Sequence, residues 1–219
     1  MRIPKHIGVI PDGNRRWAIE RNLSKEEGYN YGVDPGIELI RICKKLGIEE
    51  LTFYGFTMDN TRRTSEQRKA FTSACIQAGY GAINEGSNFL VVGDTKSPMF
   101  PDELMPYTSR KSFGSRNITV NLLVNYGWQW DLKGLKNPEN ENKKSSTKKD
   151  IISSLKSKDI SRIDLIIRWG GRRRLSGFLP VQSVYSDFYV VDDYWPDFKS
   201  KHLYEALKWY DKQDITLGG

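Results

Sequence analysis

The sequence predicts a single α/β domain in which a central, mostly parallel sheet of about six strands is flanked by helices. Short apolar segments with strand character alternate along the chain with amphipathic stretches of helical periodicity, an order typical of βαβ units. The chain has 219 residues, a common length for one such domain and enough to bury a large core. We therefore expect residues 1–219 to form one domain.

Six segments have the apolar, β-rich composition of buried strands. Capping signals mark the helices between them: Asp34 and Pro35 are typical of a helix start, Gly47 of a helix end, and Thr64 opens a sequence similar to a capping box. The predicted strands are residues 7–10, 51–56, 89–92, 118–124, 164–168 and 188–191, and the predicted helices are residues 34–47, 64–83, a segment from 151 and about 199–212.

Composition excludes several classes of protein. Cys43 and Cys75 lie in separate apolar stretches without a CxxC or Cys/His cluster, which excludes a disulfide framework and a structural zinc site and fits a reducing cytoplasm. No apolar run approaches the length of a membrane span. The net charge of +7 indicates an anionic partner such as nucleic acid, phosphates or a membrane surface. Residues 137–149 contain no apolar side chain, and we expect a mobile surface loop there.

The first cluster of candidate site residues follows directly after the first predicted strand and reads Pro-Asp-Gly-Asn-Arg-Arg-Trp. Ligands bind beyond the carboxyl ends of parallel strands, where Gly13 lets the backbone approach an anion and Arg15 and Arg16 supply phosphate donors. Asp12 would repel a phosphate unless a divalent cation lies between them. The alternative is that Asp12 only caps the following helix and the arginines are solvated.

A second cluster begins at the end of the fifth predicted strand. Residues 168–177 read Arg-Trp-Gly-Gly-Arg-Arg-Arg-Leu-Ser-Gly, with four arginines beside glycines and a serine. Arg168 lies at the same edge of the sheet as Asp12 if both strands are parallel. A charge run is usually a solvated face, but this composition favours phosphate binding over that alternative.

A third polar loop, residues 56–63, follows the second predicted strand and supplies further arginine and hydroxyl donors. Three polar loops at one edge are more informative than any one alone, so we expect an anion site there. Other candidates are weaker: His6 and His202 are far apart, Asp187 by itself is an ordinary turn acid, and there is no Walker A or GxGxxG motif.

Several separate blocks resemble the cis-prenyltransferases of the undecaprenyl diphosphate synthase type, in the same order along the chain. Residues 6–18 are similar to the family's H-x-x-x-I-M-D-G-N-G-R-W-A, and residues 57–63 to S-x-E-N-W-x-R. Residues 125–131 are similar to N-Y-G-G-R-x-D, residues 164–179 to D-L-x-I-R-T-G-G-E-x-R-x-S-N-F-L, and residues 194–198 to L-W-P-D-F. The resemblance runs from His6 to about Trp209.

This resemblance implies a homodimeric, Mg²⁺-dependent enzyme that joins isopentenyl diphosphate to an allylic diphosphate (dimethylallyl, geranyl, farnesyl or geranylgeranyl) with a cis double bond. It implies Asp12 and Asn14 as catalytic residues, and Asp12 and Asp187 as metal ligands. It also implies an apolar tunnel between the sheet and the helices at about 35–46 and 65–83. The implied substrate-binding residues are Gly13, Asn14, Arg15, Arg16, Trp17, Lys25, Tyr29, Thr57, Asn60, Arg63, Arg168, Arg174 and Ser176.

Some positions depart from the family pattern, mostly around the expected diphosphates. Arg15 replaces a glycine, Tyr29 a histidine, Thr61 a tryptophan, Arg172 a glutamate and Gly177 an asparagine. These departures favour a divergent member that makes a short or medium product, in the cytoplasm, with peripheral membrane contact for product release. The alternatives are irregular prenyl coupling, transfer to a hydroxyl acceptor, and a non-catalytic partner subunit. A nucleic-acid-binding module is less favoured than any of these.

Overall fold

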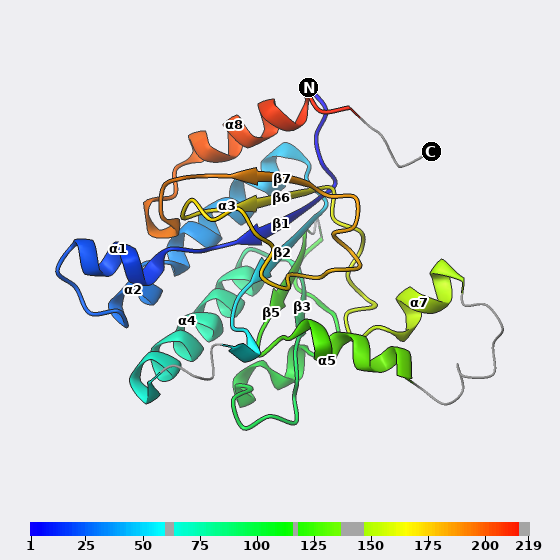
Figure 1. The fold of residues 1–219 in the computed structure, drawn as a ribbon, viewed down its shortest axis with the longest axis horizontal. Helices are drawn as coiled ribbons and strands as arrows, with labels where there is room; N and C mark the ends of the chain where they lie inside the picture. The colour runs from blue at the N-terminus through cyan, green and yellow to red at the C-terminus, as the bar shows by residue number, and fades with distance from the viewer. Residues whose placement is uncertain (60–63, 116–117, 137–146, 215–219) are drawn as a thin grey trace.

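The computed structural model describes residues 1–59, 64–115, 118–136 and 147–214. It contains one seven-stranded sheet with the strand order β4-β3-β5-β2-β1-β6-β7 (Figure 1). All neighbouring strands are parallel except β3 and β4, which are antiparallel. The predicted α/β architecture is confirmed, because the described chain forms one mostly parallel sheet with helices packed against it.

Each of the six predicted strands is present, with boundaries that differ by one or two residues. The two-residue strand β4 is the addition, and its exposed, polar sequence gives no strand signal. The strands are β1 (His6–Ile10), β2 (Glu50–Tyr54), β3 (Asn88–Val92), β4 (Lys111–Ser112), β5 (Thr119–Leu123), β6 (Leu165–Arg168) and β7 (Asp187–Val190).

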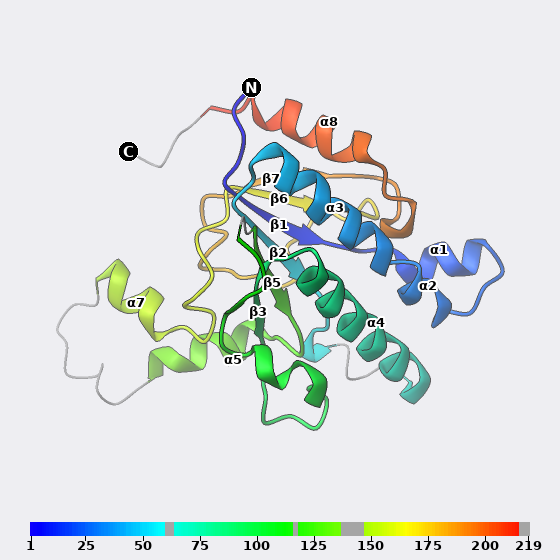
Figure 2. The same cartoon turned by 180° about the vertical axis from the view of Figure 1, so that it is seen from behind.

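The helices cover the sheet unevenly. On one face of the sheet, β1 residues pack against α3, α4 and α8 (Figure 2). On the other face, the strands pack against the segment between α7 and β7. The helices are α1 (Asn14–Glu20), α2 (Glu27–Asn30), α3 (Val33–Leu46), α4 (Ser65–Asn84), α5 (Trp128–Leu132), α7 (Lys148–Ser154) and α8 (Ser200–Tyr210), with short 3-10 helices at Asp102–Tyr107, Lys133–Lys136 and Trp195–Asp197.

Capping signals explain where α3 ends and where α4 begins. Gly47 follows α3 with a φ of 75°, the left-handed conformation that ends helices at glycine. The Thr64 side chain accepts a hydrogen bond from the Gln67 N–H at 3.4 Å and so caps α4. The start of α3 differs from the prediction, because Asp34 lies inside its first turn, where an acidic side chain is favoured by the helix dipole.

The prediction of a surface loop at 137–149 is wrong for its last three residues. Thr147 caps α7, accepting from the Asp150 N–H while the Asp150 carboxylate accepts from the Thr147 N–H. Residues 147–149 therefore belong to the start of a helix, and residues 137–146 lie outside the described part of the chain. No helix in the described ranges combines the length and the hydropathy that crossing a membrane requires.

Candidate active site

The carboxyl ends of β1, β2 and β6 meet at one edge of the sheet, and the three polar loops start there. Ile10 lies opposite Arg168 in the register of β1 and β6, so the loops that contain Asp12 and Arg168 begin side by side. Thr57, after β2, forms an isolated parallel bridge with Tyr126, which follows β5. The sheet topology thus places chemistry-bearing residues from distant parts of the sequence at a single edge.

The Asp12 carboxylate accepts two hydrogen bonds at this edge. Its Oδ1 accepts the Gly13 N–H at 2.7 Å, and its Oδ2 accepts Arg168 Nη2 at 2.8 Å. Arg16 Nη2 lies 3.6 Å from the same Oδ2. The Arg168 side chain is 5% exposed and that of Asp12 is 33% exposed. The carboxylate therefore balances a buried charge while it remains accessible to a ligand.

Two glycines allow the loops to pack closely around Asp12. Gly13 has a φ of 104° and Gly170 a φ of 82°, a region that other residues rarely adopt. A Cβ on Gly13 would lie 2.5 Å from Tyr194 Cδ1, and a Cβ on Gly170 would lie 2.6 Å from Arg16 Nη2. Both positions therefore need glycine for conformation, and Gly13 needs it for space as well.

Arg168 also organises the loop that follows β6. It donates through Nη1 to the Arg174 carbonyl and to Ser176 Oγ, the latter at 3.0 Å. The Tyr54 hydroxyl donates to the Ser176 carbonyl at 2.9 Å. Burial raises the pKa of Tyr54, so its hydroxyl stays protonated and keeps this hydrogen bond at neutral pH. The expected residues Arg168, Arg174 and Ser176 are thus brought together beside Asp12.

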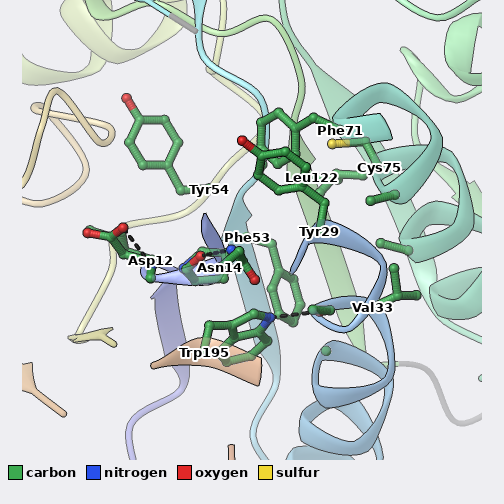
Figure 3. Close-up of a pocket in the computed structure, with 18 of the residues that line it drawn as sticks. Asp12, Asn14, Tyr29, Val33, Phe53, Tyr54, Phe71, Cys75, Leu122 and Trp195 are labelled. Atoms are coloured by element: carbon green, nitrogen blue, oxygen red, sulfur yellow. Dashed lines mark hydrogen bonds between the residues drawn. The ribbon is translucent and has the colours of Figure 1, made fainter. Parts of the chain in front are cut away.

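A cavity of about 540 Å³ opens at this polar edge and extends between the sheet and helices α3 and α4. Its mouth is polar and its interior is apolar, and Figure 3 shows Asp12 and Asn14 on one side and Phe71, Cys75 and Val33 on the other. The cavity lies where the sequence leads us to expect the tunnel. The apolar lining comprises Ile10, Tyr29, Val33, Ile37, Ile40, Phe53, Phe71, Ala74, Cys75, Ala78, Ala82, Phe89, Val120, Leu122 and Trp195.

Two expected residues mark the passage from the mouth to the interior. Asn14 donates through Nδ2 to the Pro11 carbonyl at 2.9 Å, and its buried Oδ1 has no hydrogen-bond partner among the described residues. Tyr29 is buried and packs on Phe71 with ring centroids 4.7 Å apart. Asn14 therefore offers an acceptor near the mouth, while Tyr29 narrows the apolar part of the cavity.

Trp17 and Lys25 do not line the cavity as the structure describes it. Trp17 is buried, and its indole N–H donates to Asp197 Oδ1 at 2.9 Å, which ties α1 to the Trp195–Asp197 turn. Lys25 is exposed in the segment between α1 and α2. In this structure Trp17 has a structural position, and Lys25 lies outside the group of cavity-lining cations.

The structure does not bring Asp187 to Asp12 within one chain. Asp187 is the first residue of β7, and β7 and β6 align it with Leu165, which β1 aligns with Ile7. Asp12 lies five positions beyond Ile7, so more than about 10 Å of strand separates the two carboxylates at about 3.3 Å per residue. Burial raises the pKa of Asp187, although the Arg2 guanidinium opposes that shift.

Asn60 and Arg63 lie outside the described residues. Tyr54, Asp59 and Arg172 also line the cavity, although the sequence predicts no individual role for them. Asp59 and Arg172 could have been anticipated, because they lie in two of the three post-strand loops. Tyr54 could not, because an aromatic residue that ends a buried strand is equally typical of the core.

Comparison with known proteins identifies the family. The model of the undecaprenyl diphosphate synthase family of prenyltransferases matches residues 10–218. The chain belongs to this family. An isoprenyl transferase of Nitrosomonas europaea is 33% identical, with 99% of this chain and 86% of that protein covered. The ditrans,polycis-undecaprenyl-diphosphate synthase of Aliivibrio fischeri, specific for (2E,6E)-farnesyl diphosphate, is 29% identical, with 99% and 89% covered.

A solved structure has the same fold. Lavandulyl diphosphate synthase from Lavandula x intermedia, solved with dimethylallyl diphosphate, aligns with a TM-score of 0.85 over 99% of this chain and 98% of that one. At 23% sequence identity this likeness concerns the fold alone.

The donor set at the mouth fits the magnesium ion that the family implies. In the described residues no group of three or more His, Cys, Asp or Glu side chains could form a complete protein cage for a metal. Mg²⁺ commonly uses one or two carboxylates together with substrate phosphates and water. Asp12 is a partly exposed carboxylate at a cavity mouth rich in phosphate-binding cations, so it suits this mode of binding.

Proposed function

We propose that this enzyme is a cis-prenyltransferase that condenses isopentenyl diphosphate with an allylic diphosphate and releases a short or medium prenyl diphosphate. The observation that carries the proposal is the division of one cavity into a guanidinium-rich mouth around Asp12 and an apolar interior. A prenyl diphosphate has the same division, with a highly charged head and a hydrocarbon tail. The curated relatives named as isoprenyl transferases support this substrate class.

The mouth can hold two diphosphates, one on each side of Asp12. Gly13, Asn14, Arg15 and Arg16 line the side formed by α1, where we assign the allylic diphosphate. Arg168, Arg174 and Ser176 line the other side, where we assign isopentenyl diphosphate. Arginine suits both positions, because its planar guanidinium binds phosphate oxygens through paired hydrogen bonds.

In the proposed reaction the bond between the allylic carbon and its diphosphate oxygen breaks, and the diphosphate leaves with the electron pair. A new carbon–carbon bond joins the allylic unit to the isopentenyl unit, which loses a proton to form the new double bond. Arg15 and Arg16 stabilise the charge that develops on the departing diphosphate. Asp12 would hold Mg²⁺, which supplies further neutralisation of that charge when it is bound.

The apolar interior holds the growing chain and excludes water from the reacting carbons. Small side chains on one face of α4, at Ala74, Ala78 and Ala82, leave room beside the sheet, and Phe89 lines the cavity near that end. The size of about 540 Å³ suits a short or medium product better than a long one.

The proposal is tested by incubating the protein and Mg²⁺ with labelled isopentenyl diphosphate and, in turn, dimethylallyl, geranyl, farnesyl and geranylgeranyl diphosphate. We expect label in a product longer than the primer for at least one primer. Products formed from the primer alone would indicate irregular coupling, and label on an added alcohol would indicate transfer to a hydroxyl acceptor. Absence of every such product would indicate a non-catalytic subunit and overturn the proposal.

The oligomeric state and the cellular location of the enzyme are part of the same proposal. We propose a homodimer that acts in the cytoplasm and contacts membranes only peripherally when product is released. Light scattering coupled to size-exclusion chromatography tests the dimer, and co-sedimentation with lipid vesicles in the presence of product tests the membrane contact.

A further inference from the structure

The arginines of the loop after β6 are not equivalent. The two terminal nitrogens of Arg168 already bond Asp12, Ser176 and the Arg174 carbonyl, and its side chain is 5% exposed. Arg172 and Arg173 are both exposed and adjacent in sequence, but only Arg172 lines the cavity. The two neighbours therefore differ in position while they share charge and size.

Arg172 directly follows a backbone turn, Gly170–Gly171, that is hydrogen-bonded to the residues just after β7. The Gly170 N–H donates to the Asp193 carbonyl at 2.8 Å, and the Gly171 N–H donates to the Val191 carbonyl at 3.1 Å. Both glycines have left-handed φ angles, of 82° and 71°. This turn lies directly against the Asp12 backbone and the Arg16 side chain, because a Cβ on Gly170 would meet both within 3.0 Å.

Tyr194 and Arg16 pack together beside Gly13, on the α1 side of Asp12. The Tyr194 ring packs against Gly13 and lies 5.0 Å from the Arg16 guanidinium, and its hydroxyl donates to Glu20. Gly170, two residues before Arg172, packs against the Arg16 side chain, and Arg16 and Arg172 both line the cavity beside Asp12. The charges of both arginines oppose the rise in the pKa of Tyr194 that its hydrogen bond to Glu20 causes, which agrees with this placement.

Arg172 has unused binding capacity on this side. In the described part of the chain it has no hydrogen-bond or ion-pair partner, whereas Arg16 already lies 3.6 Å from Asp12. Five guanidinium groups and two carboxylates line the described part of the cavity, so the mouth has an excess of positive charge before any ligand binds. A free guanidinium in that setting is suited to a phosphate group.

We propose that Arg172 is a specificity-determining residue that binds the diphosphate held beside Gly13 and Arg16, the site assigned to the allylic substrate. The inference rests on the proposed function for the identity of that substrate. It separates the two sites by their arginines: Arg172 acts with Arg16 on the α1 side, and Arg174 acts with Ser176 on the other. The loop after β6 thus contributes to both sites.

The test measures binding of farnesyl thiolodiphosphate, an allylic probe that resists cleavage, to the full-length protein by calorimetry with Mg²⁺ at constant ionic strength. We expect Arg172→Ala to raise the dissociation constant at least tenfold and Arg172→Lys to raise it less. Arg173→Ala is the matched control, because it removes the same charge one residue away from the cavity lining, and we expect less than a twofold change. Circular dichroism melting curves should coincide for all variants, because both side chains are exposed.

A second readout is the Michaelis constant for isopentenyl diphosphate, which Arg172→Ala should leave within about twofold. A larger rise in that constant, with unchanged probe binding, would place Arg172 in the other site and overturn the inference. Equal weakening by Arg172→Ala and Arg173→Ala would also overturn it, because general charge would then suffice. If the wild-type enzyme elongates a primer and Arg172→Ala binds the probe as tightly as the wild type does, the inference about Arg172 is refuted and the proposed function stands. Weakened binding of the probe and of inorganic diphosphate, without elongation from any primer, supports Arg172 and refutes the proposed function.

Discussion

Replacing Asp12 by asparagine separates the structural role of this carboxylate from its proposed role at the metal. Asparagine keeps an oxygen for the Gly13 N–H, so the start of the loop remains satisfied. The negative charge that faces Arg168 and Arg16 is lost. Asp12→Ala would remove both features at once and leave Nη2 of the buried Arg168 without its carboxylate acceptor, so its effect on folding and its effect on turnover would be mixed.

The cost in stability follows from the exposure of the two partners. A hydrogen bond to a charged group contributes about 1.5–3 kcal/mol, and the partly exposed Asp12 belongs at the lower end of that range. A loss of about 1.5–2 kcal/mol corresponds to a fall in melting temperature of roughly 3–8 °C for a chain of this size. The initial rate should fall by more than tenfold, a change of about 1.4 kcal/mol or more in the activation free energy.

The assay combines initial rates at saturating substrates and Mg²⁺ with melting curves. Asp197→Asn is the matched control, since Asp197 is also 33% exposed, pairs with Arg21 at 3.0 Å and accepts the Trp17 indole N–H outside the cavity. The control should lose a similar amount of stability and keep most of its activity. If Asp12→Asn retains more than about a tenth of the wild-type rate, or if Asp197→Asn loses as much activity, the assignment of Asp12 is refuted.

Three further perturbations test other parts of the site and the core. Gly13→Ala should lower the free energy of unfolding by about 1–3 kcal/mol and weaken probe binding, because the left-handed backbone and the Tyr194 ring leave no room for a Cβ; unchanged melting and binding would be the opposite result. Ala78→Phe should shift the products, separated by chromatography after dephosphorylation, toward fewer isoprene units; an unaltered distribution would mean that the chain does not pass Ala78. Burial lowers the pKa values of His6 and His202 below 6.5, so in mild acid the unfolded chain binds more protons than the folded protein does. The melting temperature should therefore fall as the pH is lowered from about 7 to about 5, and a melting temperature that does not change with pH would contradict this.

The sequence predicts the edge of the sheet that carries the site, because a loop's position after a strand is enough to place it. The Asp12 loop and the Arg168 loop follow neighbouring parallel strands, and the register of β1 and β6 brings them together as the topology requires. The same rule separates Asp187 from them. Asp187 is the first residue of its strand, so it lies at the amino edge of the sheet. In this case the family resemblance and the sheet geometry disagree.

Contacts between side chains were less predictable. Nothing in the local pattern around Trp17 shows that Asp197, 180 residues away, accepts its indole N–H. Tyr54 likewise reaches the site only because its hydroxyl meets the Ser176 carbonyl across 122 positions of sequence. Periodicity and turn chemistry describe the backbone, whereas these contacts depend on how the loops pack after the sheet has formed.

The most direct test of the central claim is the structure of the product itself. Labelled isopentenyl diphosphate and the best allylic primer should give a dephosphorylated product that is longer than the primer by whole isoprene units. Nuclear magnetic resonance should show a cis geometry at every newly formed double bond. A product with trans bonds, or one that contains no carbon from isopentenyl diphosphate, would contradict the account.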